Sequence, residues 1–179
     1  MITIAFTGGG TGGHIYPGLA VAAELQKHWD PGVCRIFWIG AVTGMDRSIV
    51  ESAGFKFFGI PAGRLRRYFS LKTIPDIFRV IAGFISVRRI LRREKPCFLF
   101  SKGGYVSVPP CAAAASLKIP VFTHESDFSP GLATRINARF ARTVFTAYNE
   151  TSGFFPKKIR DRIITAGNPV RRNFFVRIR

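Results

Sequence analysis

The sequence of 179 residues predicts an α/β fold with a Rossmann-like, doubly wound parallel sheet. Short apolar runs of strand length alternate with longer segments of helical periodicity, which is the order that such a sheet requires. The first apolar run, Ile2–Phe6, leads into a turn with five glycines that opens into a helix. Turns of this kind are typical of these sheets, because the turn and the start of the helix together favour an anion.

Local composition predicts each further element. Aromatic and β-branched residues fill the short runs, as they do in buried strands. The longer segments begin near proline or glycine and carry apolar residues three and four positions apart, as helices do. The expected strands are 35–39, 55–60, 98–101, 120–124 and two near Thr143 and Ile163, and the expected helices are 17–28, 44–53, 74–93, 106–117 and 131–140.

Composition indicates one globular domain of ordinary size. The chain is 47% apolar, which is sufficient for a packed core, and no apolar run reaches the roughly 20 residues that would span a bilayer. Met1 leads directly into a strand without the basic and apolar regions of a signal peptide, so we expect a cytoplasmic protein. The three cysteines are too scattered to predict a zinc site, and no metal is expected.

The formal net charge of +17 is concentrated in two segments. Residues 64–95 hold ten Lys or Arg, and residues 157–179 hold eight. Excess positive charge indicates an anionic partner, either nucleic acid or an acidic membrane surface. The basic residues flank aliphatic stripes and no nucleic-acid-binding motif is present, so we expect the membrane and no nucleic acid.

The long helix expected at 74–93 carries two apolar stripes. One stripe, from Val80 to Leu91, suits packing against the sheet. A second stripe would remain partly outside and runs into Arg88. An apolar stripe beside arginines is typical of a helix that lies on an anionic membrane, although a partner domain could also cover it. The residues of the second stripe are Ile74, Ile77, Phe78, Ile81 and Ile85.

Three polar loops follow expected strands and would meet at one edge of the sheet, where such folds bind ligands. The first is the glycine turn with His14, and the second is the turn at 101–107 with Gly103 and Gly104. The third, at 123–131, holds His124, Glu125 and Asp127 before a helix that Ser129 and Pro130 would cap. Each loop also has a purely structural interpretation, as a tight turn, a helix cap or a buried histidine.

The first turn also fits the dinucleotide-binding fingerprint, with glycines at 8, 10 and 13. That fingerprint requires an acidic residue about 20 positions later, at the end of the second strand. The second strand ends in Gly40-Ala-Val, and Asp46 comes too late. Nicotinamide and flavin are therefore disfavoured, and no cofactor is expected.

Four motifs in order resemble the amino-terminal half of the MurG family of bacterial glycosyltransferases. That family transfers N-acetylglucosamine from UDP-N-acetylglucosamine to lipid I, which gives lipid II for peptidoglycan. The motifs are Gly8-Gly-Gly-Thr-Gly-Gly-His-Ile-Tyr-Pro-Gly-Leu-Ala20, Gly103-Gly-Tyr-Val-Ser107, His124-Glu-Ser-Asp with Pro130-Gly-Leu132, and Gly167-Asn-Pro-Val-Arg171.

The resemblance implies a metal-independent, inverting GT-B enzyme at the cytoplasmic face of the membrane. Residues 1–166 would form the acceptor-binding domain, residues 167–179 would begin the interdomain segment, and the carboxyl-terminal donor domain would be absent. His14 is the implied general base, with Tyr105 and Glu125 as supporting polar groups. Gly103 and Gly104 would hold the acceptor diphosphate. Implied contacts to the UDP-sugar come from Thr11, Gly12, Gly13 and Arg171.

Two features depart from the family. The third motif reads His-Glu-Ser-Asp, where many members have His-Glu-Gln-Asn, so a donor contact at Asp127 is uncertain. Members are also about twice as long, so the chain is expected to bind acceptor and membrane but to be inactive alone. A non-catalytic lipid-diphosphate-binding fragment, a related transferase for another acceptor and a basic nucleic-acid-binding module remain alternatives.

Overall fold

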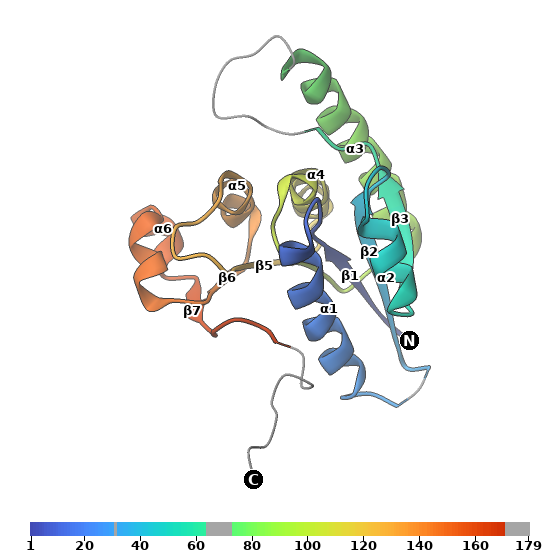
Figure 1. Cartoon of the computed structure of the whole chain (residues 1–179), viewed down its shortest axis with the longest axis horizontal. Coiled ribbons are helices and arrows are strands. Elements are labelled where there is room, and N and C mark those ends of the chain that lie inside the picture. Colours follow the sequence, from blue (N-terminus) through green and yellow to red (C-terminus); the bar gives the residue numbers. More distant parts are fainter. Residues whose placement is uncertain (31, 64–72, 171–179) are drawn as a thin grey trace.

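The structure, a computed structural model, describes residues 1–30, 32–63 and 73–170, with only the backbone described at Thr73 and Ile74. In this part of the chain seven parallel strands form one sheet in the order β3-β2-β1-β4-β5-β6-β7, as Figure 1 shows. The predicted fold class is confirmed. The strands are β1 (Ile2–Thr7), β2 (Cys34–Ala41), β3 (Lys56–Ile60), β4 (Phe98–Ser101), β5 (Val121–Glu125), β6 (Thr143–Thr146) and β7 (Ile163–Thr165).

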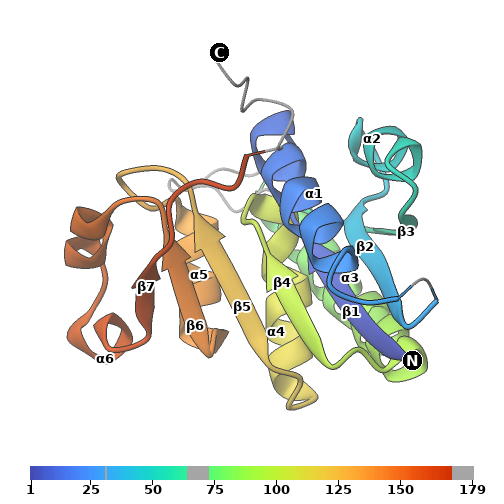
Figure 2. The same cartoon turned by 90° about the horizontal axis from the view of Figure 1, so that it is seen from below.

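Helices cover both faces of the sheet (Figure 2). One face carries α1 and α2, and the other carries α3, α4 and α5, which pack against one another. The α-helices are α1 (Gly12–Gln26), α2 (Asp46–Ser52), α3 (Thr73–Glu94), α4 (Val108–Ser116), α5 (Leu132–Phe140) and α6 (Lys157–Arg160), and the 3-10 helices are η1 (Tyr105–Ser107) and η2 (Asn149–Phe154).

The alternation of side chains along the central strands creates two cores. On β1, Ile4 and Phe6 face α1, whereas Ala5 faces the layer of α3 and α4. On β2, Trp38 belongs to the first core and Phe37 to the second. Because both faces of these strands are buried, the strands read as continuous apolar runs, as parallel strands do.

The winding of the sheet reverses between β1 and β4. The chain moves outward from β1 through β2 to β3, and α3 then returns it so that β4 pairs with the other edge of β1. In this pairing Thr7 lies beside Ser101, and the Lys102 N–H donates to the Thr7 carbonyl at 2.8 Å. The two glycine turns therefore start side by side, at the position where doubly wound sheets bind ligands.

Two helix boundaries differ from the sequence prediction for reasons that involve proline. α1 begins at Gly12 and contains Pro17, although proline usually marks the first turn, so His14 lies in the helix and not before it. The segment predicted as one helix at 106–117 divides into η1 and α4, because Pro109 and Pro110 suit the first turn of a new helix. The elements η2 and α6 were not predicted.

α3 presents the two stripes that its sequence predicts. Val87 and Leu91 are buried against the sheet layer, and the first turns of α3 project beyond the neighbouring elements (Figure 1). Arg88 is half-buried. The side chain of Ile74 lies outside the described residues. The other members of the second stripe are exposed, as expected: Ile77 at 46%, Phe78 at 68%, Ile81 at 50% and Ile85 at 45%.

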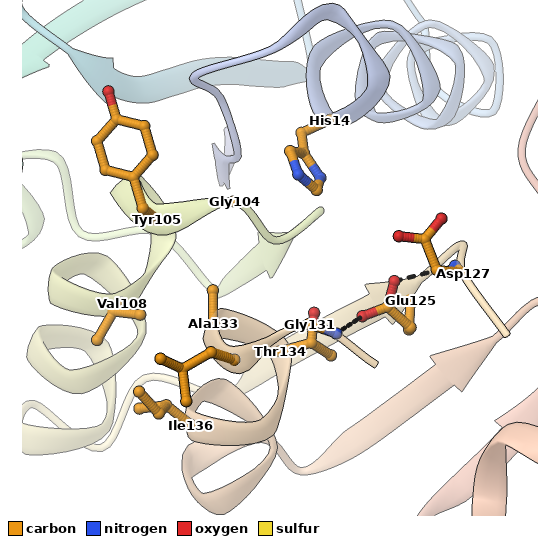
Figure 3. Close-up of a pocket in the computed structure, with 11 residues that line it drawn as sticks. His14, Gly104, Tyr105, Val108, Glu125, Asp127, Gly131, Ala133, Thr134 and Ile136 are labelled. Atoms are coloured by element: carbon orange, nitrogen blue, oxygen red, sulfur yellow. Dashed lines mark hydrogen bonds between the residues drawn. The ribbon is translucent and has the colours of Figure 1, made fainter. Parts of the chain in front are cut away.

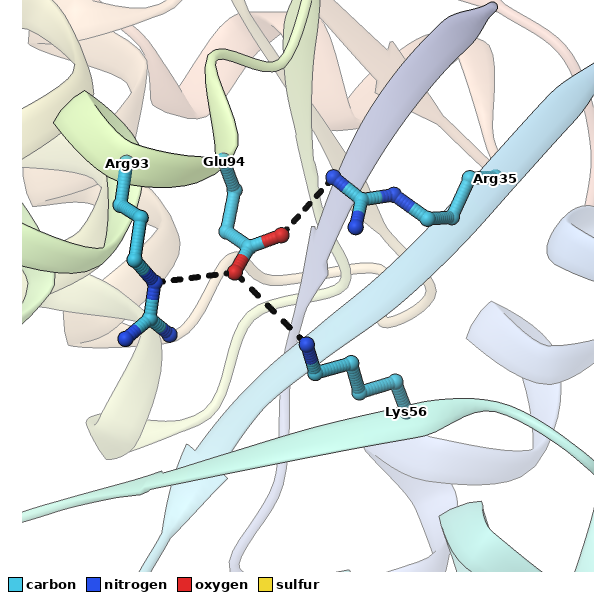
Figure 4. A network of polar contacts seen from close by, with 4 residues as sticks. All are labelled: Arg35, Lys56, Arg93 and Glu94. Atoms are coloured by element: carbon cyan, nitrogen blue, oxygen red, sulfur yellow. Dashed lines mark hydrogen bonds and ion pairs between the residues drawn. The ribbon is translucent and has the colours of Figure 1, made fainter.

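A buried carboxylate fixes the carboxyl end of α3. Glu94 is 8% exposed and accepts from Arg35 at 2.8 Å and from its neighbour Arg93 at 3.1 Å, while Lys56 lies 3.7 Å away (Figure 4). Arg35 comes from β2 and Lys56 from β3. The carboxylate thus ties the crossover helix to the two strands that precede it.

His124 on β5 joins the sheet to the segment after β7. Its Nε2–H donates to the Gly167 carbonyl at 2.8 Å, and the residue is only 3% exposed. The pKa of His124 is lowered to about 4, mainly by burial and also by the nearby Lys102 ammonium, while the Gly167 bond and Glu125 oppose the shift. The ring is therefore neutral at pH 7, as a buried structural histidine.

We expect Glu94→Gln to lower the free energy of unfolding by about 1–2 kcal/mol, because a charged hydrogen-bond acceptor is lost while its partners stay partly hydrated. Urea denaturation measures this change. Glu51→Gln is the matched control: the Glu51–Arg47 pair, at 2.9 Å, is about half exposed, so its loss should cost less than about 0.5 kcal/mol. Equal losses in the two variants would contradict the anchoring role of Glu94.

Stability should fall as the pH is lowered below neutrality, because of His124. Unfolded histidine binds a proton below about pH 6.5, whereas folded His124 does so only near pH 4. The unfolded state therefore gains protons first, and this group alone removes up to about 3 kcal/mol between pH 7 and pH 4. Urea denaturation across this range checks the slope, which should be flatter in His124→Gln and unchanged in His28→Gln, a substitution at an exposed residue just after α1.

Candidate functional site

The first glycine turn is anchored by two buried side chains of the β2–α2 unit. The indole N–H of Trp38 donates to the Gly8 carbonyl at 2.9 Å. The Gly10 N–H donates to the Asp46 carboxylate at 3.0 Å, and Asp46 is 1% exposed. In the sequence, Asp46 was considered only as a ribose ligand, and it comes too late in the chain for that role. In the structure, Asp46 fixes the first glycine turn.

The second glycine turn is held by a network of buried polar groups centred on Asn137 of α5. Its amide Nδ2 donates to Ser107 Oγ at 2.7 Å and to Ser101 Oγ at 3.2 Å. Ser101 Oγ also accepts from the Gly103 N–H at 3.2 Å, and Ser107 Oγ donates to the Gly104 carbonyl at 2.7 Å. The network fixes the end of β4 and the start of η1 relative to α5. The sequence contained no signal for Asn137.

The two turns touch each other, and only glycine allows this contact. Gly104 has a φ of +80°, and a Cβ atom there would lie 2.3 Å from the Gly9 carbonyl oxygen. A Cβ atom on Gly10, with φ of +85°, would lie 2.4 Å from the ring of Tyr105. Any larger residue would separate the two turns.

His14 lies between the turns in a defined tautomer. It is the third residue of α1, and its Nδ1 lies 3.2 Å from the Lys102 carbonyl oxygen. Because a carbonyl only accepts hydrogen bonds, the neutral ring carries its proton on Nδ1. Nε2 is then the unprotonated nitrogen, which can accept a proton from a bound hydroxyl.

Glu125 shapes the third loop from within. It is 4% exposed, and its two oxygens accept the backbone N–H groups of Asp127 at 3.0 Å and Gly131 at 3.1 Å. The expected cap by Ser129 is wrong: α5 begins after Gly131 without a side-chain cap, and the Glu125 carboxylate takes the N–H there. Asp127 is exposed.

Lys102 is a buried residue of the site that sequence analysis did not select. It is 2% exposed, and its ammonium donates to Ser126 Oγ at 2.7 Å. Burial lowers the pKa of Lys102 to about 8, and the carboxylates of Glu125 and Asp127 oppose this shift. The sequence did contain one signal that Lys102 is buried. It stands between a strand and two glycines, where a long cation has little room to reach solvent.

A pocket of about 220 Å³ brings together five of the ten predicted catalytic and substrate-binding residues (Figure 3). Gly103 is not in the lining but lies close to two lining residues: a Cβ atom on it would be 3.2 Å from Thr134 Oγ1 and 3.7 Å from His14 Nδ1. The lining does not include Thr11, Gly12 or Gly13, which open α1 beside it. Arg171 lies outside the described residues. The pocket is lined by His14, Gly104, Tyr105, Val108, Glu125, Asp127, Gly131, Leu132, Ala133, Thr134 and Ile136.

His14 and Tyr105 approach the pocket from different elements. Figure 3 shows His14 on α1 projecting toward the side that holds Glu125 and Asp127. Tyr105 projects from η1, and its ring packs on the first glycine turn at Gly10. Helix starts at both turns direct backbone N–H groups to one region, which favours an anionic group next to a proton acceptor.

Two features are absent from residues 1–30, 32–63 and 73–170. No group of three or more His, Cys, Asp or Glu side chains there could hold a metal ion. No helix in these ranges is long and apolar enough to cross a membrane.

Comparisons with known proteins agree with the predicted resemblance. Residues 4–146 match the glycosyltransferase family 28 N-terminal domain. A UDP-N-acetylglucosamine–N-acetylmuramyl-(pentapeptide) pyrophosphoryl-undecaprenol N-acetylglucosamine transferase of Treponema denticola is 56% identical over 98% of this chain and 46% of its own length. The transferase of the same name from Shouchella clausii is 49% identical over 96% of this chain and 47% of its length.

Solved structures extend this likeness to the fold. The crystal structure of Acinetobacter baumannii MurG matches 96% of this chain and 46% of its own chain, with a TM-score of 0.76 and 26% identity. A UDP-GlcNAc 2-epimerase from Neisseria meningitidis shares the fold, with a TM-score of 0.63 and 16% identity. The chain spans slightly less than half the length of the curated relatives that it matches. The chain belongs to glycosyltransferase family 28, and its residues 4–146 correspond to the amino-terminal domain of that family.

Proposed function

We propose that this chain is the acceptor- and membrane-binding half of an inverting transferase that moves N-acetylglucosamine from UDP-N-acetylglucosamine to lipid I. The observation that carries the proposal is the position of His14 between two glycine turns that touch, with its Nδ1 bonded to the Lys102 carbonyl. The names of the relatives in Treponema denticola and Shouchella clausii support this choice of donor and acceptor.

In the proposed reaction, His14 acts as general base and the turns as the diphosphate site. Backbone N–H groups near the starts of α1 and η1, including that of Gly104, bind the acceptor diphosphate, while Ser101 Oγ accepts the Gly103 N–H and fixes the second turn. Nε2 of His14 takes the proton of the acceptor hydroxyl while the hydroxyl oxygen attacks the anomeric carbon of the donor N-acetylglucosamine. The bond from that carbon to UDP breaks on the opposite face, so the configuration inverts and UDP leaves with the bonding electron pair.

Glu125 is a weaker candidate for the base than His14. Both of its oxygens already accept backbone N–H groups that hold the loop and the start of α5. Proton uptake there would weaken these bonds, whereas Nε2 of His14 takes no part in the bond that fixes its ring. We therefore propose that Glu125 positions Asp127 and α5, and that Tyr105 shapes the pocket through its contact with Gly10.

The donor site would require a second domain. Thr11, Gly12 and Gly13 lie at the open start of α1, and with Asp127 and Arg171 they are the proposed contacts to UDP-N-acetylglucosamine from this half. The catalytic interpretation applies to an enzyme in which a carboxyl-terminal donor domain, joined after residues 167–179, completes the nucleotide pocket. Alone, the chain would bind the acceptor without turnover, which corresponds to the non-catalytic alternative.

We infer that α3 binds the anionic cytoplasmic face of the cell membrane. Four large apolar side chains, between 45% and 68% exposed, lie on one helix surface, and arginines follow them along the helix. The two acidic residues of α3 are each within ion-pair distance of arginine, which reduces their repulsion of anionic lipid. This chemistry favours a lipid surface over nucleic acid, because the exposed residues are mostly aliphatic and cannot stack on bases.

Replacement of His14 by Ala, in an active full-length enzyme that contains this chain, should lower kcat by roughly 10²–10⁴-fold, because general base catalysis contributes about that much. The acceptor KM should change little, since the turns and not the imidazole bind the diphosphate. Steady-state kinetics with radiolabelled donor measures both constants, and His28→Ala, at an exposed residue just after α1, is the control. Unchanged turnover would assign the base to Glu125.

Membrane binding can be tested by sedimentation with vesicles that contain phosphatidylglycerol. Ile81→Ser should weaken binding roughly fivefold, because a half-exposed apolar side chain loses about 1 kcal/mol of burial. The matched control is Ile164→Ser, since Ile164 on β7 is 53% exposed and Ile81 is 50% exposed. High salt should release the protein in part. Equal effects of the two substitutions, or no binding at low salt, would exclude α3 as the membrane surface.

A further inference from the structure

We propose that Lys102 is a positioning residue whose buried ammonium group balances the carboxylates of Glu125 and Asp127 and so prepares the pocket for a diphosphate. The inference rests on the proposed function, because the anion is the acceptor diphosphate. It concerns a residue that does not line the pocket but is hydrogen-bonded to His14, which does, and to Ser126.

Lys102 connects all three loops of the site. Its N–H donates to the Thr7 carbonyl at 2.8 Å, at the end of β1. Its carbonyl accepts from His14 Nδ1 at 3.2 Å, and its ammonium donates to Ser126 Oγ at 2.7 Å. The Lys102 carbonyl therefore sets the ring orientation of His14, the proposed base. The Lys102 side chain fixes the third loop.

The charges of the pocket lining require such a cation. Glu125 and Asp127 both line the pocket, and none of the lining residues is Lys or Arg. Two carboxylates would repel a diphosphate, which carries at least two negative charges at neutral pH. Arg135, on the adjacent α5, donates to the Pro130 carbonyl and so is directed to the backbone of the loop.

The surroundings of Lys102 keep its charge at neutral pH in spite of burial. Desolvation lowers the pKa of Lys102 to about 8, while the two carboxylates favour the charged form. Two histidines lie next to it: His14 bonds the Lys102 backbone carbonyl, and His124 is neutral because its pKa is lowered to about 4. At pH 7 most molecules therefore hold one buried cation against two carboxylates.

Lys102→Met tests the charge and leaves the volume nearly unchanged. Carbon-detected NMR of the 179-residue chain should find the pKa of Lys102 at about 8, and lower in Asp127→Asn, because a carboxylate that favours the ammonium form is lost. Calorimetry with farnesyl diphosphate should find binding about tenfold weaker in Lys102→Met. Lys118→Met removes an exposed cation after α4 and should change neither value.

Charge rescue distinguishes this role from a structural one. Lys102→Met removes one positive charge, and Asp127→Asn removes one negative charge, so the double variant has the original net charge. Its affinity for farnesyl diphosphate should therefore return to within about threefold of that of the unmodified chain. The unmodified chain provides a test that needs no variant: its affinity should fall as the pH rises through about 8, where Lys102 loses its proton. Lys102→Met should lack this fall.

The outcomes separate the two proposals. An unshifted Lys102 titration in Asp127→Asn, or weakened binding that Asp127→Asn does not restore, would overturn the role of Lys102. Absence of farnesyl diphosphate binding by the unmodified chain would contradict the proposed function instead. In that case the titration of Lys102 still decides whether its ammonium balances the carboxylates.

Discussion

The parallel pairing of β1 with β4 is the constraint on which the site depends. It places Thr7 beside Ser101 at the carboxyl ends of the two central strands, where the winding of the sheet reverses. The glycine turns that follow must then share one space, and a Cβ atom at Gly104 would lie 2.3 Å from the Gly9 carbonyl oxygen. The position of His14, the openings of α1 and η1 and the pocket itself follow from this contact.

Buried polar side chains keep the turns in place against the flexibility of glycine. Asp46 fixes the first turn, Asn137 the second and Glu125 the third, each by hydrogen bonds to backbone N–H groups or serine hydroxyls. A buried polar group is costly unless it is paired, so these contacts fix one arrangement strongly. Lys102 links the three loops and supplies the positive charge of the set.

The sequence was sufficient to predict the fold, because strand composition, helical periodicity and glycine turns are local signals. The polar segments after apolar strands also predicted that His14 and Glu125 lie near each other, and the pocket lining contains both. Tyr105, in the same lining, was selected through the family resemblance. The sequence did not predict the anchoring residues, whose partners are distant in the sequence: Asp46 bonds a residue 36 positions away, Asn137 one 30 positions away and Lys102 one 24 positions away. The start of α1 was missed because Pro17 lies inside the helix.

The most direct test of the diphosphate site is to map the amide shifts of the 15N-labelled chain during titration with farnesyl diphosphate. The account predicts that the largest shifts fall in residues 8–14 and 103–107, in the two touching turns. A larger groove of about 790 Å³ along the second half of α1 offers a clear alternative location. Shifts that concentrate at residues 19–28 and leave both turns unchanged would contradict the account.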